Sequence, residues 1–145
     1  MSTEAHKALV RQVVEDWHRK DLAALDEHLD RGYVNRDPSN PDVRDLESYK
    51  RWAAAAWEAF PDMRIAIEDL IADGDRVAKV WSFEATHTGD FAGIAPTGRR
   101  VTWSGITVYR LAGDKVVECS WQTDTLGLLQ QLGAIPAPET VVVGP

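Results

Sequence analysis

The spacing of hydrophobic residues changes near Phe60, and this change constrains the fold more than any other feature of the sequence. Before Phe60, apolar residues recur every three to four positions, as they do on one face of an amphipathic helix. After Pro61, four segments are rich in β-branched and aromatic residues, which is typical of strands. A chain that places helices first and strands afterwards indicates an α+β fold.

Three helices are predicted in the first half of the chain. The first covers residues 4–20, and the second follows Asp21, which can cap it, and ends at Gly32. A short extended piece at residues 33–35 and a proline-containing loop come next. The third helix covers residues 46–60 and is closed by the proline that follows it.

Four strands are predicted in the second half, at residues 63–72, 76–87, 100–111 and 115–123. Consecutive strands joined by turns form an antiparallel meander, and such a sheet can hold helices on one of its faces. We therefore expect one α+β domain over residues 1–133, with the N-terminal helices packed on a curved sheet. The tail over residues 134–145 could be an edge strand, a partner contact or disordered.

The composition excludes several classes of function. The net charge of −7 argues against a nucleic-acid partner, because binding to phosphates requires clustered Lys and Arg. Cys119 is the single cysteine, so neither an internal disulfide nor a cysteine-based metal site is predicted. No segment reaches the ~20 apolar residues that span a bilayer, and the N-terminus does not resemble a signal peptide. We expect a cytoplasmic protein without a membrane partner.

The chain contains six tryptophans in 145 residues, which is an unusual number. Large aromatic residues at core positions of helices and strands usually serve packing alone. Taken together, they also favour an apolar pocket for a flat, polycyclic or aromatic ligand, in which two or three of them form the wall. The tryptophans selected as ligand contacts are Trp17, Trp57, Trp81 and Trp103.

Asp124 lies between the last predicted strand and a short amphipathic helix at residues 126–132. One interpretation is that its carboxylate points into a cavity among the tryptophans, where burial would raise its pKa and make it a useful base. The other interpretation is a helix cap that accepts hydrogen bonds from free backbone N–H groups of the first turn. The residues alone leave both roles open.

Four further polar residues are candidates for the same site. His87 could donate a hydrogen bond to a ligand oxygen or fix the loop after its strand. Gln122 lies two residues before Asp124 and so on the same strand face, which makes it another possible donor. Asn35 could contact a ligand carbonyl or form a turn. Arg110 could face either side of its strand, because a one-residue change in register reverses the faces.

Three stretches, THTGDFAGIAPTGRRV (86–101), VYRLAGDKVVECSWQTD (108–124) and LGLLQQLG (126–133), resemble the SnoaL-like polyketide cyclase family. This family belongs to the superfamily of nuclear transport factor 2, ketosteroid isomerase and scytalone dehydratase. The resemblance implies a cone-shaped α+β barrel with a mixed, mostly antiparallel sheet and a deep apolar pocket. It also implies a homodimer.

The same resemblance implies an activity. Cyclases of this family close a ring by intramolecular aldol condensation, without a metal or an organic cofactor, and their acid/base aspartate lies in a W-x-x-D segment. Here that segment is Trp121 to Asp124. We therefore expect Asp124 to be the acid/base in ring closure on a hydrophobic carbonyl substrate, with His87 as a second catalytic residue.

The sequence departs from the family pattern at one point. In characterised cyclases a histidine on the strand equivalent to residues 100–111 can assist the aspartate, and this chain has no histidine between Gly89 and Gly133. Other readings on the same fold are an isomerase, a dehydratase or a hydroxylase-like enzyme. A protein that binds a small apolar ligand without converting it is a further alternative.

Overall fold

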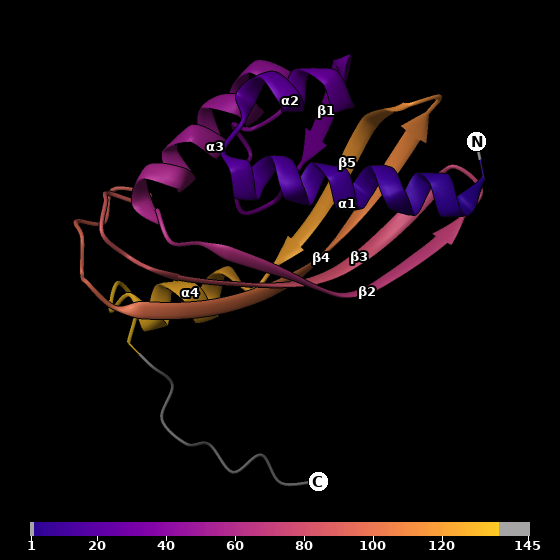
Figure 1. Ribbon diagram of the computed structural model, residues 1–145. Helices are drawn as coiled ribbons and strands as arrows, with labels where there is room; N and C mark the ends of the chain where they lie inside the picture. The colour runs from indigo at the N-terminus through magenta and orange to yellow at the C-terminus, as the bar shows by residue number, and fades with distance from the viewer. Residues whose placement is uncertain (1, 137–145) are drawn as a thin grey trace, which may run out of the picture.

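The computed structural model describes residues 2–136 (Figure 1). The elements in chain order are α1 (Thr3–Arg19), α2 (Leu22–His28), β1 (Leu29–Arg36), α3 (Leu46–Ala59), β2 (Arg64–Asp73), β3 (Arg76–Thr86), β4 (Arg100–Ala112), β5 (Lys115–Thr123) and α4 (Thr125–Gln131). Residues 137–145 of the predicted tail lie outside the described residues, so the division of the chain at residue 134 stays a prediction.

Side-chain caps fix where three of the helices begin. The Ser2 hydroxyl accepts a hydrogen bond from the Ala5 N–H at 3.1 Å at the start of α1. Asp21 caps α2, as the sequence predicted. Asp45 and Ser48 form a reciprocal capping box at the start of α3. These caps satisfy backbone donors that the first helical turn leaves free.

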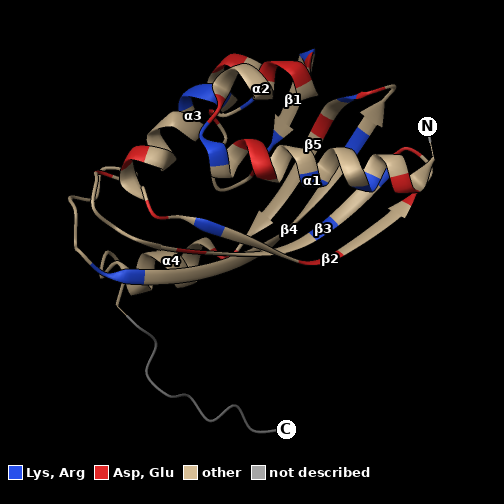
Figure 2. Cartoon of the chain, viewed as in Figure 1, with Lys and Arg blue, Asp and Glu red and all other residues tan. Residues whose placement is uncertain are grey.

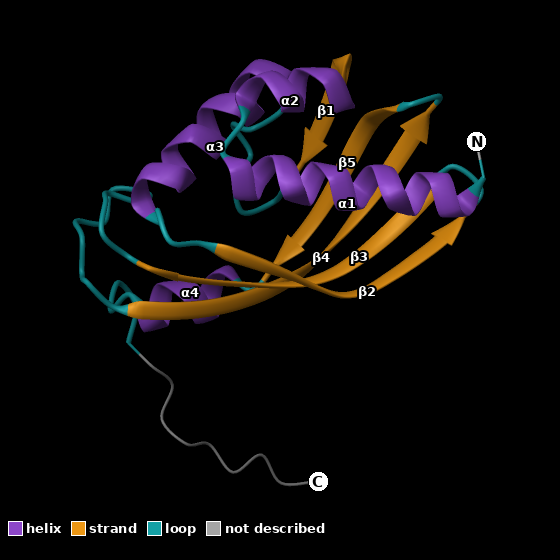
Figure 3. Ribbon diagram, in the orientation of Figure 1, coloured by secondary structure: helices purple, strands orange, loops and turns teal. Residues whose placement is uncertain are grey.

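The five strands form one mixed sheet in the order β1-β5-β4-β3-β2. Among the described strands only the β1–β5 pair is parallel, and the other three pairs are antiparallel, which confirms the predicted mixed, mostly antiparallel sheet. Within the described residues β1 and β2 are the two edges, so the sheet curves without closing into a barrel. The helices α1, α2 and α3 cover its inner face (Figure 3).

The second helix ends earlier than the sequence predicted. Leu29 has helical spacing to the leucines before it, yet it begins β1 and pairs with Val116 of β5. A parallel partner that lies far along the chain thus overrides the local pattern. The predicted extended piece of three residues lies within the second half of an eight-residue strand.

The core lies between the inner face of the sheet and the three N-terminal helices. Along β3 the inward positions alternate strictly with outward ones, and Val77, Lys79, Trp81 and Phe83 all face the core. The outer surface carries acidic and basic residues in interspersed positions (Figure 2). No helix of the described part is both long and apolar enough to cross a membrane.

Candidate functional site

A cavity of about 220 Å³ lies between the inner face of the sheet and the helices. Its wall is mostly apolar and draws on α1, α3, α4 and all strands from β2 to β5. Trp17, Trp81 and Trp103 line it, as predicted. Trp52 and Trp121 also line it, although the sequence analysis did not select them as ligand contacts. Aromatic faces therefore dominate the surface that a ligand would meet.

Two of these tryptophans use the indole N–H, their only polar group, in a hydrogen bond within the protein. The Trp17 indole N–H donates to the Tyr49 hydroxyl at 2.9 Å, and the Trp81 indole N–H donates to the Thr107 hydroxyl at 2.9 Å. An indole N–H that already donates to a protein hydroxyl is not available to a ligand oxygen. The two rings therefore present only their apolar surfaces to the cavity.

Asn35 is buried and accepts the indole N–H hydrogen bond of a third tryptophan in the wall, Trp121. Its Oδ1 accepts hydrogen bonds from the Trp121 indole N–H and from the Tyr33 hydroxyl, both at 2.7 Å. Its Nδ2 donates to the Val43 carbonyl at 3.0 Å. The geometry therefore assigns Asn35 to the support of the wall at Trp121. Asn35 is not among the residues that line the cavity, so the predicted contact with a ligand carbonyl has no support from its placement.

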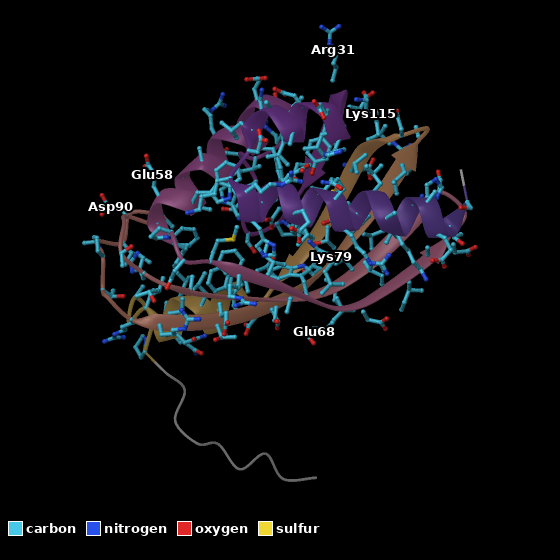
Figure 4. The ribbon with its side chains drawn as sticks, in the orientation of Figure 1. Arg31, Glu58, Glu68, Lys79, Asp90 and Lys115 are labelled. Atoms are coloured by element: carbon cyan, nitrogen blue, oxygen red, sulfur yellow. The ribbon has the colours of Figure 1, made fainter. Side chains whose placement is uncertain are left out.

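The most unusual group in the cavity is the amine of Lys79, which the sequence analysis missed. Lys79 is 4% exposed, and Figure 4 shows it between α1 and the sheet, whereas Glu68 points away from the sheet. Its Nζ lies 5.8, 5.3 and 5.7 Å from the ring centroids of Trp81, Tyr109 and Trp121. Within the described residues no carboxylate pairs with this amine.

Burial has a direct effect on the protonation of Lys79. Loss of water contact disfavours the ammonium form and lowers the pKa of Lys79 to about 8, and the nearby Cys119 side chain opposes this only in part. The thiol itself stays neutral, because burial raises the pKa of Cys119 to about 12. A pKa of about 8 leaves roughly one tenth of the amine neutral at pH 7 and half at pH 8.

A phenol lies beside the amine. Tyr109 lines the cavity and is 2% exposed, and its hydroxyl has no hydrogen-bond partner among the described side chains and backbone groups. Burial raises the pKa of Tyr109 well above its ordinary value, so the hydroxyl keeps its proton and remains a donor. The cavity thus combines a buried amine and an unengaged O–H donor within an aromatic wall.

The polar part of the wall comes from the loop after β1 and from the start of α4. Of the acidic residues in the described chain, Asp37 alone lines the cavity, and its carboxylate accepts hydrogen bonds from the Ser39 N–H and the Asn40 side chain. Ser39 also accepts one from the Thr125 hydroxyl at 2.8 Å. The described residues contain no group of three or more metal-ligating side chains close enough to hold an ion.

Asp124 does not face the cavity, and this part of the prediction was wrong. Its side chain is exposed and caps α4, with Oδ1 accepting from the Gly127 N–H at 3.0 Å. Side chains alternate between the two faces of a strand, so the three-residue step of W-x-x-D puts Asp124 opposite to Trp121. The cap interpretation fits the geometry, and a catalytic role for Asp124 stays a prediction without support from its placement.

His87 fixes a loop beside the cavity. The ring is fully buried, and its Nδ1 lies 3.2 Å from the donating Thr97 N–H and 3.0 Å from the Thr97 hydroxyl. This contact holds the end of the loop after β3, and the same loop places Phe91 against Phe60 in the cavity wall. The loop-fixing interpretation of His87 therefore agrees with the structure. The catalytic interpretation has no support, because His87 is not among the residues that line the cavity.

The remaining predicted contacts also lie away from the cavity. Gln122 is exposed on the outer face of β5. Arg110 is on the outer face of β4, where its Nη2 lies 3.5 Å from Glu118 Oε2. A bulge next to Arg110, at the base of the turn to β5, sets this register. Trp57 is buried in the core between helices and contacts Trp17 edge to face.

Comparison with known proteins gives one family and many similar structures. A family model described as SnoaL-like polyketide cyclase matches residues 7–132. No protein of curated function matches the chain. AclR from Streptomyces galilaeus, a proposed hydroxylase, is 31% identical over 95% of this chain and 87% of its own, with a TM-score of 0.86.

Two proposed polyketide cyclases are also similar in structure. One is from Acidithiobacillus ferrooxidans and is 34% identical over 92% of this chain and 99% of its own, with a TM-score of 0.81. The other is IdmH from Streptomyces antibioticus, which is 26% identical over 88% of this chain and 98% of its own, with a TM-score of 0.77. The order of helices and strands found here is therefore a property of a group of related proteins.

Proposed function

The chain belongs to the SnoaL-like polyketide cyclase family, and we propose that it closes a ring in a hydrophobic carbonyl compound through acid/base chemistry at the Lys79 amine. The observation that carries this proposal is a buried amine in an aromatic cavity, with no carboxylate partner within residues 2–136. In this proposal Lys79 replaces Asp124 as the reacting group, and Asp124 contributes to the fold.

The aromatic wall supports a flat apolar substrate. Rings of Trp81 and Trp121 stand edge to face with centroids 6.3 Å apart, and their indole N–H groups are already paired. Such surfaces favour stacking and apolar contact over hydrogen bonding. A chain of carbonyl groups attached to an aromatic or alkyl part would fold against them, which brings the two reacting carbons together.

The amine and the phenol can carry out the proton transfers of an aldol closure. Neutral Lys79 removes a proton from the carbon next to a carbonyl and becomes an ammonium ion, while the Tyr109 O–H donates to the enolate oxygen. The enolate carbon attacks a second carbonyl of the same molecule and forms the new C–C bond. The resulting alkoxide then takes the proton from the Lys79 ammonium, which restores the neutral amine.

This cycle returns every proton to the product, so it needs no cofactor. A positioned base contributes roughly 10²–10⁴-fold to the rate of such a reaction. Burial assists in two ways, because it keeps a fraction of the amine neutral and because it strengthens the attraction between the new ammonium and the enolate. We also retain the homodimer as a proposal that follows from the family.

The test uses a linear aryl compound with several alternating carbonyl groups, incubated with the purified protein. Ring closure gives a product of the same mass that elutes separately in liquid chromatography, and dehydration of that product removes one water. We expect Lys79→Met to lower the initial rate by roughly 10²–10⁴-fold. The matched control is Lys7→Met on the surface of α1, for which we expect the wild-type rate.

A full rate in Lys79→Met would overturn the assignment. A second candidate function is a hydroxylase-like reaction, which the similarity to AclR favours. In that case the same assay, supplied with dioxygen as the oxidant and a hydride donor as the reductant, would show a product heavier by one oxygen atom. Tight binding without any product would indicate a protein that only holds an apolar ligand.

A further inference from the structure

We infer that Lys79 is also a nucleophile, which condenses with the carbonyl carbon of a bound aldehyde or ketone to form an imine. The inference rests on the proposed function for one thing, the class of ligand that enters the cavity. It goes further by proposing a covalent bond between the protein and that ligand.

The surroundings of the Lys79 amine leave its nitrogen available. Three aromatic rings, of Trp81, Tyr109 and Trp121, lie within 6 Å of Nζ, and no hydrogen bond engages Nζ among the described residues. Within the described residues no carboxylate holds the group as an ammonium ion. The Lys79 side chain lines the cavity, so a ligand carbonyl seated among the rings would meet the nitrogen directly.

A surface lysine shows the contrast. Lys50 contacts Asp26 at 2.9 Å and Glu47 at 3.0 Å, and the hydrogen bond to Asp26 is the main cause that raises the pKa of Lys50. Such an amine stays protonated and is a poor nucleophile at neutral pH. At pH 8 the neutral fraction of Lys79 exceeds that of a lysine with the ordinary pKa of 10.5 by roughly a hundredfold.

The covalent step balances with the groups present. The neutral Lys79 nitrogen attacks the carbonyl carbon and forms a C–N bond, and a proton moves from nitrogen to oxygen to give a carbinolamine. The C–O bond then breaks, and the hydroxyl leaves as water with a proton that the Tyr109 O–H can supply. The nitrogen of the protonated imine then returns a proton to the Tyr109 oxygen, which restores the phenol and gives the neutral imine. The sum is amine plus carbonyl giving imine plus water, and the apolar wall around the bond disfavours the reverse hydrolysis.

Such an imine would change how the substrate is activated. A protonated imine withdraws electrons more strongly than the carbonyl that it replaces, so the adjacent carbon loses its proton more readily. That proton passes to the water that imine formation released, because the Lys79 nitrogen is now bonded to the ligand and cannot act as the base. The carbon nucleophile is then an enamine attached to Lys79, and the ligand cannot leave before the C–N bond is hydrolysed. This would keep a reactive intermediate within the cavity.

The test uses 2-naphthaldehyde as the probe and sodium cyanoborohydride as the hydride donor, which reduces an imine to a stable secondary amine. The full chain is treated at several pH values and examined by intact mass and peptide mapping. We expect one adduct on Lys79 that forms roughly a hundredfold faster than adducts on Lys7, Lys50 or Lys115 at pH 8. Its rate should rise with pH to a half-maximum near 8.

Peptide mapping is essential, because the α-amino group also titrates near pH 8. Lys79→Arg keeps a cation but loses the nucleophile, so the fast adduct should disappear, while Lys7→Arg keeps it. Circular dichroism checks that Lys79→Arg is folded, and Lys79→Met serves as a second variant if it is not. Labelling spread evenly over the lysines, or an unchanged adduct rate in both Lys79 variants, would overturn the inference.

Quenching of tryptophan fluorescence by the probe separates the two proposals. If the probe quenches the fluorescence and leaves Lys79 unlabelled, the imine is excluded and the ring-closure proposal stands. If the probe neither quenches nor labels, the imine is again excluded, and the proposed class of ligand fails with it.

Discussion

Lys79 on the inner face of β3 and Asp124 at the start of α4 are ionisable residues in opposite surroundings. Lys79 lies among aromatic rings with no partner of opposite charge in the described chain, and burial lowers its pKa to about 8. Asp124 is open to water and accepts a backbone hydrogen bond from Gly127. Of the two residues, Lys79 is therefore the candidate for chemistry in the cavity, because it is buried without a partner of opposite charge in the described chain.

The largest expected effect on stability comes from Lys79→Met, which keeps an unbranched side chain and removes the charge. The pKa of Lys79 falls from 10.5 to about 8 on folding, which corresponds to a penalty on the order of 3 kcal/mol at pH 7. Lys79→Met removes this penalty, and the cost of repacking the cavity around the new side chain cancels part of the gain in stability. We expect the free energy of unfolding at pH 7 to rise by roughly 1–3 kcal/mol, measured by urea denaturation.

The pH dependence of the free energy of unfolding tests whether the effect of Lys79→Met comes from the charge of the amine. Between the folded pKa of about 8 and the unfolded value of 10.5, the Lys79 amine binds more protons in the unfolded chain than in the folded one, so its contribution to stability rises with pH. Cys119 acts in the opposite direction near pH 9 and above, because burial raises its pKa to about 12, and it is present in both wild type and Lys79→Met. Buried tyrosines such as Tyr109 also act in this opposite direction near pH 10 and above, because burial raises their pKa. The series therefore runs from pH 7 to 9.5. If the free energy of unfolding varied with pH in parallel for wild type and Lys79→Met, Lys79 would not be a buried amine with a lowered pKa.

The next effect concerns the wall behind the amine. A Cβ at Gly105 would lie 2.5 Å from the Trp81 ring and 2.6 Å from the Gln122 carbonyl oxygen, so Gly105→Ala must displace one of them. We expect a loss of about 1–3 kcal/mol in the free energy of unfolding. Weaker quenching of tryptophan fluorescence by 2-naphthaldehyde should accompany it. Ser104→Ala, at the neighbouring exposed position, should change neither quantity.

The smallest effects are expected at Asp124. Asp124→Ala removes the cap of α4 and should lower the free energy of unfolding by about 1 kcal/mol, whereas Asn caps nearly as well and Asp124→Asn should change it by only a few tenths. Thermal denaturation measures both. The ring-closure rate of Asp124→Asn should stay within about twofold of wild type. A hundredfold loss of rate in a folded Asp124→Asn protein would reverse the comparison and restore this carboxylate as the acid/base.

The order of helices and strands could be predicted because each element carries its own hydrophobic period. The change of period near Phe60 marked the start of the four consecutive strands β2 to β5, and the glycine-containing turns separated them. The end of the second helix could not be predicted, because Leu29 fits a helical stripe as well as it fits a strand. Its pairing with Val116, which decides the matter, joins segments that are far apart in sequence.

The candidate site was predicted only in part, although its decisive residue left a signal. Lys79 is in phase with Val77, Trp81 and Phe83 along β3, so strict alternation already places a lysine on the apolar face. The same alternation separates Trp121 from Asp124. The tryptophan wall followed from composition, whereas the choice of wall residues depended on helix packing. That is why Trp57 was selected in place of Trp52.

The parallel pairing of the first strand with the last has a consequence for how the protein is made. Asn35 and the ring that it holds, Trp121, are 86 residues apart. At about 5–20 residues per second, a ribosome needs roughly 4–17 s to synthesise the chain between them. During that interval β1 has no strand beside it in the described chain, and the nascent protein has no complete cavity. Every polypeptide that stops short of Trp121 lacks this part of the wall.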